Sequence, residues 1–281
     1  MISHGWSSLL PFEFERDTWT LTRVIDLANA TPVLVKISGT KRELRIETAA
    51  RLNKGVAERV VRDVRHMFRL DDDMGPFYGA MSTDPEFSWI ADYGAGRMLR
   101  SPTVFEDLVK MICTTNCSWA LTDKMATNLV ESLGRESKNG RRTFPTPEAM
   151  ALMPVKFYVN EIRAGYRAAY LKELADRVAG GELNVGEWLT SDLPTPELIK
   201  AMKSVKGVGD YAAENLLKLV GRYDGLALDS WTRAKFSRIR NNGRKASDKR
   251  IARFYSRFNS WRGLALWCDM TRDWMADGNS D

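Results

Sequence analysis

The sequence has few of the side chains that metal and thiol chemistry require. Its histidines are His4 and His66, and its cysteines are Cys113, Cys117 and Cys268. Their spacing matches neither a zinc site nor a four-cysteine iron–sulfur pattern, and three cysteines cannot make a disulfide framework. No glycine-rich loop followed by Lys and Ser or Thr is present for nucleotide phosphates. We therefore expect no metal, no cofactor and a reducing, cytoplasmic environment.

Long apolar runs are missing as well. No window approaches 18 uncharged apolar residues, so we expect no membrane span, and the first residues lack the charge-then-apolar order of a signal peptide. With 44% hydrophobic and 28% charged residues in a chain of 281, there is enough apolar material for a core and too much for disorder. At this length we expect two or three subdomains rather than one.

Acidic residues are nearly absent from one stretch near the end of the chain. From Thr232 to Arg262 the sequence has eleven Lys and Arg and a single acid, Asp248, although the whole chain has a net charge of only +6. Such a stretch is typical of a basic face that binds a polyanion, most commonly nucleic acid. The alternative is a solvated helix surface, which the near-absence of acids disfavours.

The hydrophobic pattern predicts an α+β chain with its strands first. Residues 19–25, 33–37 and 43–47 alternate partly or fully, which predicts an antiparallel sheet with a hairpin turn at 38–42. From Val56 onward the period becomes helical, and beyond about residue 100 we predict helices throughout. A hydroxyl residue followed by proline at 101–102, 146–147 and 195–196 predicts three helix starts. We expect a β-containing domain at 1–95 and a helical domain at 96–281.

The strongest motif is a pair of helices around a glycine turn. A short helix from Thr195 to about Lys203 precedes Val205-Lys-Gly-Val-Gly209, and a second helix runs from residue 210 or 211 to about 221. The glycines allow a tight hairpin with exposed backbone N–H groups, at which the positive end of the second helix dipole also points. The turn is therefore predicted to bind one DNA phosphate through Lys206, Gly207, Val208 and Gly209. An ordinary corner with a glycine cap is the alternative.

Twenty residues after that turn, an apolar run carries a single carboxylate to a helix start. The segment is Leu226-Ala-Leu-Asp229-Ser-Trp231. Taken alone, Asp229 could be an N-cap and no more.

These segments together resemble the helix–hairpin–helix DNA glycosylase superfamily, whose motif is a hairpin, a Gly/Pro-rich loop and a catalytic Asp. Residues 101–118, ending Met-Ile-Cys-Thr-Thr-Asn116-Cys-Ser, and residues 162–170 are similar to the 8-oxoguanine DNA glycosylases. Ser260-Trp-Arg262 is similar to the end of the bacterial 3-methyladenine DNA glycosylases. The resemblance covers about residues 60–275 and, more weakly, the N-terminal sheet. It implies a TATA-binding-protein-like antiparallel sheet domain followed by an all-α glycosylase domain.

The resemblance assigns the catalytic role to Asp229. A carboxylate there would stabilise the oxocarbenium character of the sugar and orient or deprotonate the attacking water. Bifunctional members have a nucleophilic Lys at the position of Tyr211, which implies a monofunctional enzyme that uses water. Lys203, Lys206 and Lys218 lie near in sequence, so a displaced nucleophile is an open alternative.

The resemblance also suggests how DNA is held. Asn116 matches the residue that fills the gap left by a flipped base, and Arg233 and Lys235 are expected to contact phosphates; a simple turn residue is the alternative for Asn116. Electron-rich rings would suit an alkylated, cationic base. The expected pocket residues are Trp119, Tyr211 and Trp231, with core packing as the alternative for each. Trp261 and Arg262 are expected to be structural.

The sequence thus favours a monofunctional DNA glycosylase of base excision repair that acts on a damaged purine, with alkylated bases favoured. A bifunctional 8-oxoguanine glycosylase/lyase and a non-catalytic helix–hairpin–helix protein are the alternatives. The expected partner is damaged double-stranded DNA, bound by a monomer in the cytoplasm and, in a bacterium, at the nucleoid. A monovalent cation at the hairpin backbone is implied by the family alone.

Overall fold

The computed structural model describes residues 1–28, 30–40 and 43–276, which form two compact units. Among these residues, the first unit, here the sheet unit, comprises 1–70, 99–190 and 205–207, and the second, here the C-terminal unit, comprises 71–98, 191–204 and 208–276. This division differs from the predicted domains 1–95 and 96–281. The cause is non-local packing, because helices after residue 100 pack with the sheet and residues 71–98 pack with the C-terminal helices.

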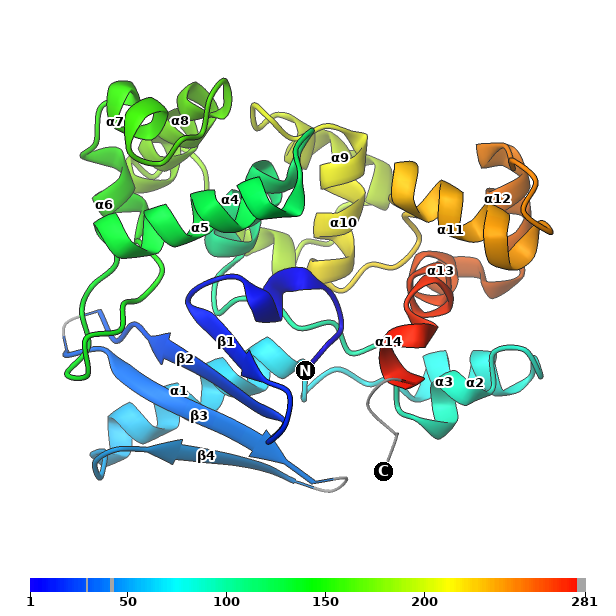
Figure 1. Ribbon diagram of the computed structural model, residues 1–281, viewed down its shortest axis with the longest axis horizontal. Helices are drawn as coiled ribbons and strands as arrows, with labels where there is room; N and C mark the ends of the chain where they lie inside the picture. Colours follow the sequence, from blue (N-terminus) through cyan, green and yellow to red (C-terminus); the bar gives the residue numbers. More distant parts are fainter. Residues whose placement is uncertain (29, 41–42, 277–281) are drawn as a thin grey trace. The chain divides into compact units, whose positions relative to one another are not determined.

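The sheet is a four-stranded antiparallel meander in the order β1-β2-β3-β4 (Figure 1). Its strands are β1 (Phe12–Glu15), β2 (Thr20–Ile25), β3 (Val33–Gly39) and β4 (Leu44–Thr48). The register places Leu21 opposite Ile37 and Ile37 opposite Ile46, so apolar side chains share one face. The three predicted strands are confirmed and β1 is additional. The predicted turn at 38–42 joins the paired β3 and β4, but residues 41 and 42 lie outside the described residues.

Helices make up the rest of the sheet unit. Helix α1 (Lys54–Phe68) lies across one face of the sheet and buries Val60, Val64 and Met67 at helical spacing (Figure 1). The others are α4 (Val104–Thr114), α5 (Trp119–Leu133), α6 (Pro147–Ala151), α7 (Val155–Asn160) and α8 (Arg167–Ala179). Two short 3-10 helices, Gly5–Ser8 and Val185–Leu189, complete the unit.

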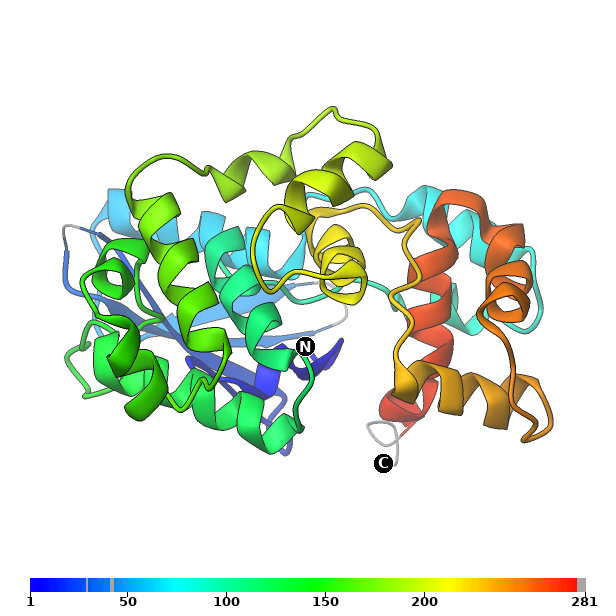
Figure 2. The same cartoon turned by 90° about the horizontal axis from the view of Figure 1, so that it is seen from above.

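The C-terminal unit is helical in its described residues. Its helices are α2 (Gly75–Ser82), α3 (Trp89–Asp92), α9 (Thr195–Lys203), α10 (Asp210–Val220), α11 (Ser230–Arg240), α12 (Asp248–Tyr255), α13 (Arg262–Met270) and α14 (Arg272–Ala276), with a 3-10 helix at Ser256–Trp261. Helices α2 and α3, drawn in cyan, lie beside the C-terminal helices, drawn in red (Figures 1 and 2). The ring of Phe77 accordingly contacts Trp261, with centroids 5.3 Å apart. None of the described helices is both long and apolar enough to span a bilayer.

The three predicted helix starts have different outcomes. Thr146 caps α6 and Pro147 is its first residue, as predicted. The start predicted at 101–102 is wrong by two residues, because Thr103 caps α4 by accepting the N–H of Glu106 at 3.2 Å. Helix α9 does begin at Thr195, but Pro194 is its N-cap and the hydroxyl makes no cap bond.

A buried cluster of charges joins the sheet to α4 within the sheet unit. Arg23 of β2 forms a bidentate pair with Glu106 at 3.0 and 2.7 Å, and Lys110, one turn along α4, donates to the same carboxylate at 2.8 Å. The Arg23 and Lys110 cations also lie over the Phe12 ring, 4.4 and 4.7 Å from its centroid. None of the three charged side chains is more than 4% exposed. The cluster therefore fixes α4 against the sheet with its polar groups satisfied.

Candidate active site

The glycine turn between α9 and α10 has the geometry of an anion site. Gly207 has a φ of 90°, and a Cβ there would lie 2.9 Å from Cδ2 of Tyr170, so the position requires glycine. Gly209 is the extended N-cap of α10, which therefore begins without a side-chain cap. Both Gly209 and Asp210 are exposed, so the first amide groups of the helix face solvent. This supports the predicted phosphate contact.

The lysines of the turn are exposed and paired with carboxylates. Lys206 Nζ lies 2.6 Å from Glu173 Oε2, and Lys203 Nζ lies 2.6 Å from Asp210 Oδ1. Side-chain exposures of 64% for Lys206 and 41% for Lys203 place both pairs in water, where an ion pair contributes little. An incoming phosphate can therefore replace these carboxylates at low cost.

Asp229 is the N-cap of α11, and only one of its two carboxylate oxygens, Oδ1, takes part in the cap. Its Oδ1 accepts the Thr232 N–H at 2.7 Å and also the Thr232 hydroxyl, while Thr232 Oγ1 accepts the Asp229 N–H at 2.8 Å. Among the described residues, no hydrogen bond or ion pair reaches Oδ2, and the side chain is only half-buried. The capping interpretation is thus correct and does not exclude a catalytic one. The cap fixes the carboxylate, and the helix dipole favours its negative charge.

Helix α10 places further polar groups close to Asp229. Burial, and after it the charge of Asp229, raises the pKa of Tyr211 to about 12, so its phenol stays neutral. Lys218 is fully buried on the same helix. Burial lowers its pKa to about 7, against the opposing charges of Glu214 and Asp229. Sequence reasoning missed Glu214, although its spacing from Tyr211 and Lys218 marks a polar stripe on an apolar helix.

Comparison with known proteins agrees with this geometry. Residues 109–260, more than half of the chain, match the model of the "HhH-GPD superfamily base excision DNA repair protein". A DNA-3-methyladenine glycosylase of Bacillus subtilis (strain 168) is 24% identical over 220 residues, which are 75% of this chain and 72% of the relative. The chain belongs to the HhH-GPD superfamily. It is therefore a DNA glycosylase of this type, a hydrolase of N-glycosyl bonds.

Solved structures of glycosylases share the whole fold. MBOgg1, solved with a low-affinity DNA ligand, has a TM-score of 0.76 at 24% identity, covering 98% of this chain and 92% of its own. The 3-methyladenine DNA-glycosylase of Archaeoglobus fulgidus has a TM-score of 0.74 at 23% identity, covering 98% and 93%. The Clostridium acetobutylicum 8-oxoguanine glycosylase/lyase, in complex with dsDNA, has a TM-score of 0.73 at 22% identity, covering 98% and 93%. The predicted sheet followed by a helical glycosylase domain is confirmed.

Asn116 occupies the corner between α4 and α5 of this HhH-GPD chain. It has a φ of 47°, which Asn tolerates better than most residues, and its side chain is exposed with Nδ2 3.5 Å from Tyr166 Oη. Arg167 donates to the carbonyl of Thr115 and so stabilises the corner next to Asn116. The residue is thus presented on a fixed, exposed turn, which suits the predicted insertion into DNA.

The aromatic residues predicted to line a base pocket lie in different local environments. Trp231 is 39% exposed, and its ring lies 6.0 Å from Trp267 and 6.1 Å from Trp274 in the C-terminal unit. Trp119 is the first residue of α5 in the sheet unit, where its indole leaves no room for a side chain at Gly5. Both rings therefore have packing roles as well as exposed edges, and their part in a base pocket stays a prediction.

Two residues expected to be structural are packed as that role requires. Trp261 stacks on Tyr223 with centroids 5.3 Å apart and an interplanar angle of 25°. Arg262 Nε donates to the carbonyl of Asp224 at 2.5 Å. They hold the chain that leads toward Asp229 against the start of α13.

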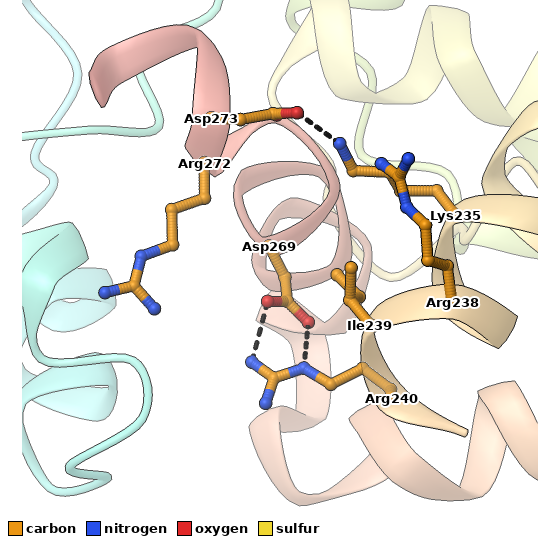
Figure 3. A pocket seen from close by; sticks show the side chains of 7 residues that line it. All are labelled: Lys235, Arg238, Ile239, Arg240, Asp269, Arg272 and Asp273. Atoms are coloured by element: carbon orange, nitrogen blue, oxygen red, sulfur yellow. Dashed lines mark hydrogen bonds and ion pairs between the residues drawn. The ribbon is translucent and has the colours of Figure 1, made fainter. Parts of the chain in front are cut away.

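The stretch from 232 to 262 is less uniformly basic than its sequence indicates. Four of its cations pair with acids of the C-terminal unit. Arg233 pairs with Asp248, the one acid of the stretch itself, whereas the other three pair with acids from outside it: Lys235 with Asp273, Arg240 with Asp269 and Glu86, and Arg257 with Asp84 and Glu86. Figure 3 shows two of these pairs in a cavity of about 450 Å³ between α11, α13 and α14. The exposed remainder is Arg238, Arg244, Lys245, Lys249, Arg250 and Arg253. Arg233 and Lys235 must therefore exchange a carboxylate for a phosphate if they bind DNA.

The structure also bears on the cations that such an enzyme could hold. In the residues described, no three His, Cys, Asp or Glu side chains are grouped as a metal site. The monovalent cation implied by the family would need backbone carbonyl oxygens, and those of Val205 and Gly207 accept no hydrogen bond from the described residues.

Proposed function

We propose that this HhH-GPD chain is a monofunctional DNA glycosylase that flips a damaged purine out of duplex DNA and hydrolyses its N-glycosidic bond, with alkylated purines as the favoured substrates. The observation that carries the proposal is the Asp229 carboxylate, which is half-exposed and is held through one oxygen by the N-cap of α11. Near it lies Tyr211, at the position where a lyase would need an amine. The names of its relatives cover both alkylated and oxidised purines, so the lesion choice rests on this aromatic residue.

The reaction follows from the charge of Asp229. As the bond from C1′ to the base lengthens, the sugar gains oxocarbenium character, which a nearby carboxylate stabilises. Water then bonds to C1′, the base leaves with the electron pair of the broken bond, and the water proton passes to the carboxylate. A base made cationic by alkylation leaves as a neutral molecule and needs no acid. This agrees with a site that has one half-exposed carboxylate and a neutral phenol.

DNA binding is assigned to groups that recognise the backbone and the gap. The bare start of α10 and Lys206 would hold one phosphate, and Asn116 would enter the stack vacated by the flipped base. Arg233 and Lys235 are proposed as further phosphate contacts, and the enzyme is proposed to act as a monomer. The decisive assay is incubation with duplexes that each carry one lesion, in which released base and strand nicking are measured separately. Release of an alkylated purine without nicking is expected, and no base release from any duplex would refute the proposal.

Borohydride trapping is expected to give no covalent protein–DNA adduct on a duplex from which the enzyme releases a base. Tyr211 cannot form a Schiff base, and Lys218 is fully buried. Trapping is followed by the shift of labelled DNA on a denaturing gel, with a known glycosylase/lyase as the positive control. The one feature on the side of the bifunctional alternative is that burial lowers the pKa of Lys218 to about 7, which would leave part of its amine unprotonated. An adduct that maps to Lys218 would establish that alternative.

A further inference from the structure

Helix α10 carries a carboxylate and an amine, Glu214 and Lys218, among largely apolar residues. Its buried residues include Ala212, Ala213, Leu216, Leu217, Leu219 and Val220. Between them, Glu214 is half-buried and Lys218, one turn later, is fully buried. Burying such groups is unfavourable unless they are paired and hydrogen-bonded. Their contacts therefore indicate what they contribute.

Glu214 contacts the loop that leads from α10 to Asp229. Its Oε2 accepts the backbone N–H of Ala227, two residues before the candidate catalytic carboxylate. Ala227 is buried and has a φ of 54°, a conformation that is unfavourable for a residue with a Cβ. Gly225 lies directly on the same side chain, since a Cβ there would be 3.1 Å from Glu214 Cβ. The carboxylate thus holds a strained backbone in place immediately before Asp229.

Lys218 is the other ionisable group of this part of α10, and with its pKa lowered to about 7 it is only partly charged at neutral pH. The charged groups that face it are Glu214 on its own helix and Asp229 at the start of α11. The loop is also tied at its beginning, where Arg222 donates to the carbonyl of Leu193 at 2.6 Å. Of these two contacts of the loop, the hydrogen bond from Ala227 to Glu214 is the nearer in sequence to Asp229.

We propose that Glu214 is a positioning residue for Asp229, acting through its hydrogen bond to the backbone N–H of Ala227. The inference rests on the proposed function and goes beyond it, because Glu214 is assigned a role through the loop backbone at Ala227 rather than in the reaction itself. Loss of the hydrogen bond would let Ala227 leave its left-handed conformation and carry Asp229 out of line with C1′. A misplacement of about 1 Å can cost about 10²-fold in rate.

The test compares Glu214→Ala, Glu214→Gln and a matched control, Glu197→Ala, which removes an exposed carboxylate on α9. Single-turnover excision, affinity for a duplex with an abasic-site analogue and thermal unfolding are measured for each. Glu214→Ala is expected to lower the excision rate about 10- to 100-fold, with affinity and folded fraction little changed. Glu214→Gln should recover most of the rate, because an amide oxygen can accept the same N–H. Equal rates for wild type and Glu214→Ala, or no recovery in Glu214→Gln, would overturn the proposal.

Hydrogen exchange over residues 222–232 provides a readout that does not depend on activity. Exchange in this segment should rise in Glu214→Ala and remain near wild type in Glu214→Gln and Glu197→Ala. Unchanged exchange in Glu214→Ala would overturn the proposed contact even for an enzyme whose substrate is unknown. Failure of the wild type to release any base, with exchange as expected, would instead refute the proposed function.

Discussion

Replacing Asp229 with Asn is expected to lower single-turnover excision by at least about 10²-fold while duplex affinity stays within about two-fold of wild type. Asn and Asp are equally good N-caps, and an amide oxygen can still accept the Thr232 N–H. The fold and the start of α11 are therefore preserved, and what is lost is the negative charge that stabilises the oxocarbenium-like sugar. Rates are measured on a lesion duplex with enzyme in excess, and affinity on a duplex with an abasic-site analogue.

Two further variants separate the two roles of Asp229. Asp192→Asn removes an exposed acid from a loop of the same unit and should leave rate and affinity unchanged. Asp229→Ala removes charge and cap together, so it should show the same rate defect plus a loss of about 1 kcal/mol in stability. An Asp229→Asn enzyme within a few-fold of the wild-type rate would show that the residue is a cap only.

The hairpin and the carboxylate could be predicted because their signals are local. The predicted bounds of α9 and α10 and the predicted start of α11 lie within a few residues of the observed ones. The prediction used the glycines, the Thr195–Pro196 pair and the apolar run before Asp229. The structure adds that the glycines are not equivalent. Gly207 is required by its φ and by Tyr170, whereas a Cβ at Gly209 would meet no described atom within 4 Å. Gly209 matters for what it lacks, a side chain that would cap or cover the first amides of α10.

Charge partners could not be predicted because they come from distant parts of the chain. The acids that neutralise Arg240 and Arg257 include Asp84 and Glu86, which lie more than 150 residues earlier, and no local pattern links the two segments. The division into units has the same origin, since packing across the sequence joins α4 to the sheet. Glu106 and Lys110 show most clearly that local sequence does not reveal the partners of a charge. As an i,i+4 pair they are typical of a solvated helix face, yet they are buried.

Replacing Glu106 with Gln is expected to lower the free energy of unfolding by about 3–5 kcal/mol at pH 7, because Arg23 and Lys110 would remain buried without a carboxylate. The change is nearly isosteric, so the loss reports charge rather than volume. Urea denaturation followed by tryptophan fluorescence measures it. The matched control is Glu47→Gln on β4, whose carboxylate is 59% exposed and 4.0 Å from Arg45, and which should change stability by less than about 1 kcal/mol.

The dependence of this loss on pH gives a second, independent check. Burial opposes ionisation of Glu106, but Arg23 and Lys110 overcome it and lower the pKa of the carboxyl from its ordinary value of 4.5 to about 2. A carboxyl with a depressed pKa stabilises the fold fully above its unfolded value and loses that contribution as the pH falls through its folded value. The difference in free energy of unfolding between wild type and Glu106→Gln should thus be constant above about pH 5 and should become smaller between pH 4.5 and 2. If this difference were absent at pH 7, or became larger in acid, the cluster would not stabilise the junction of sheet and helix through charge.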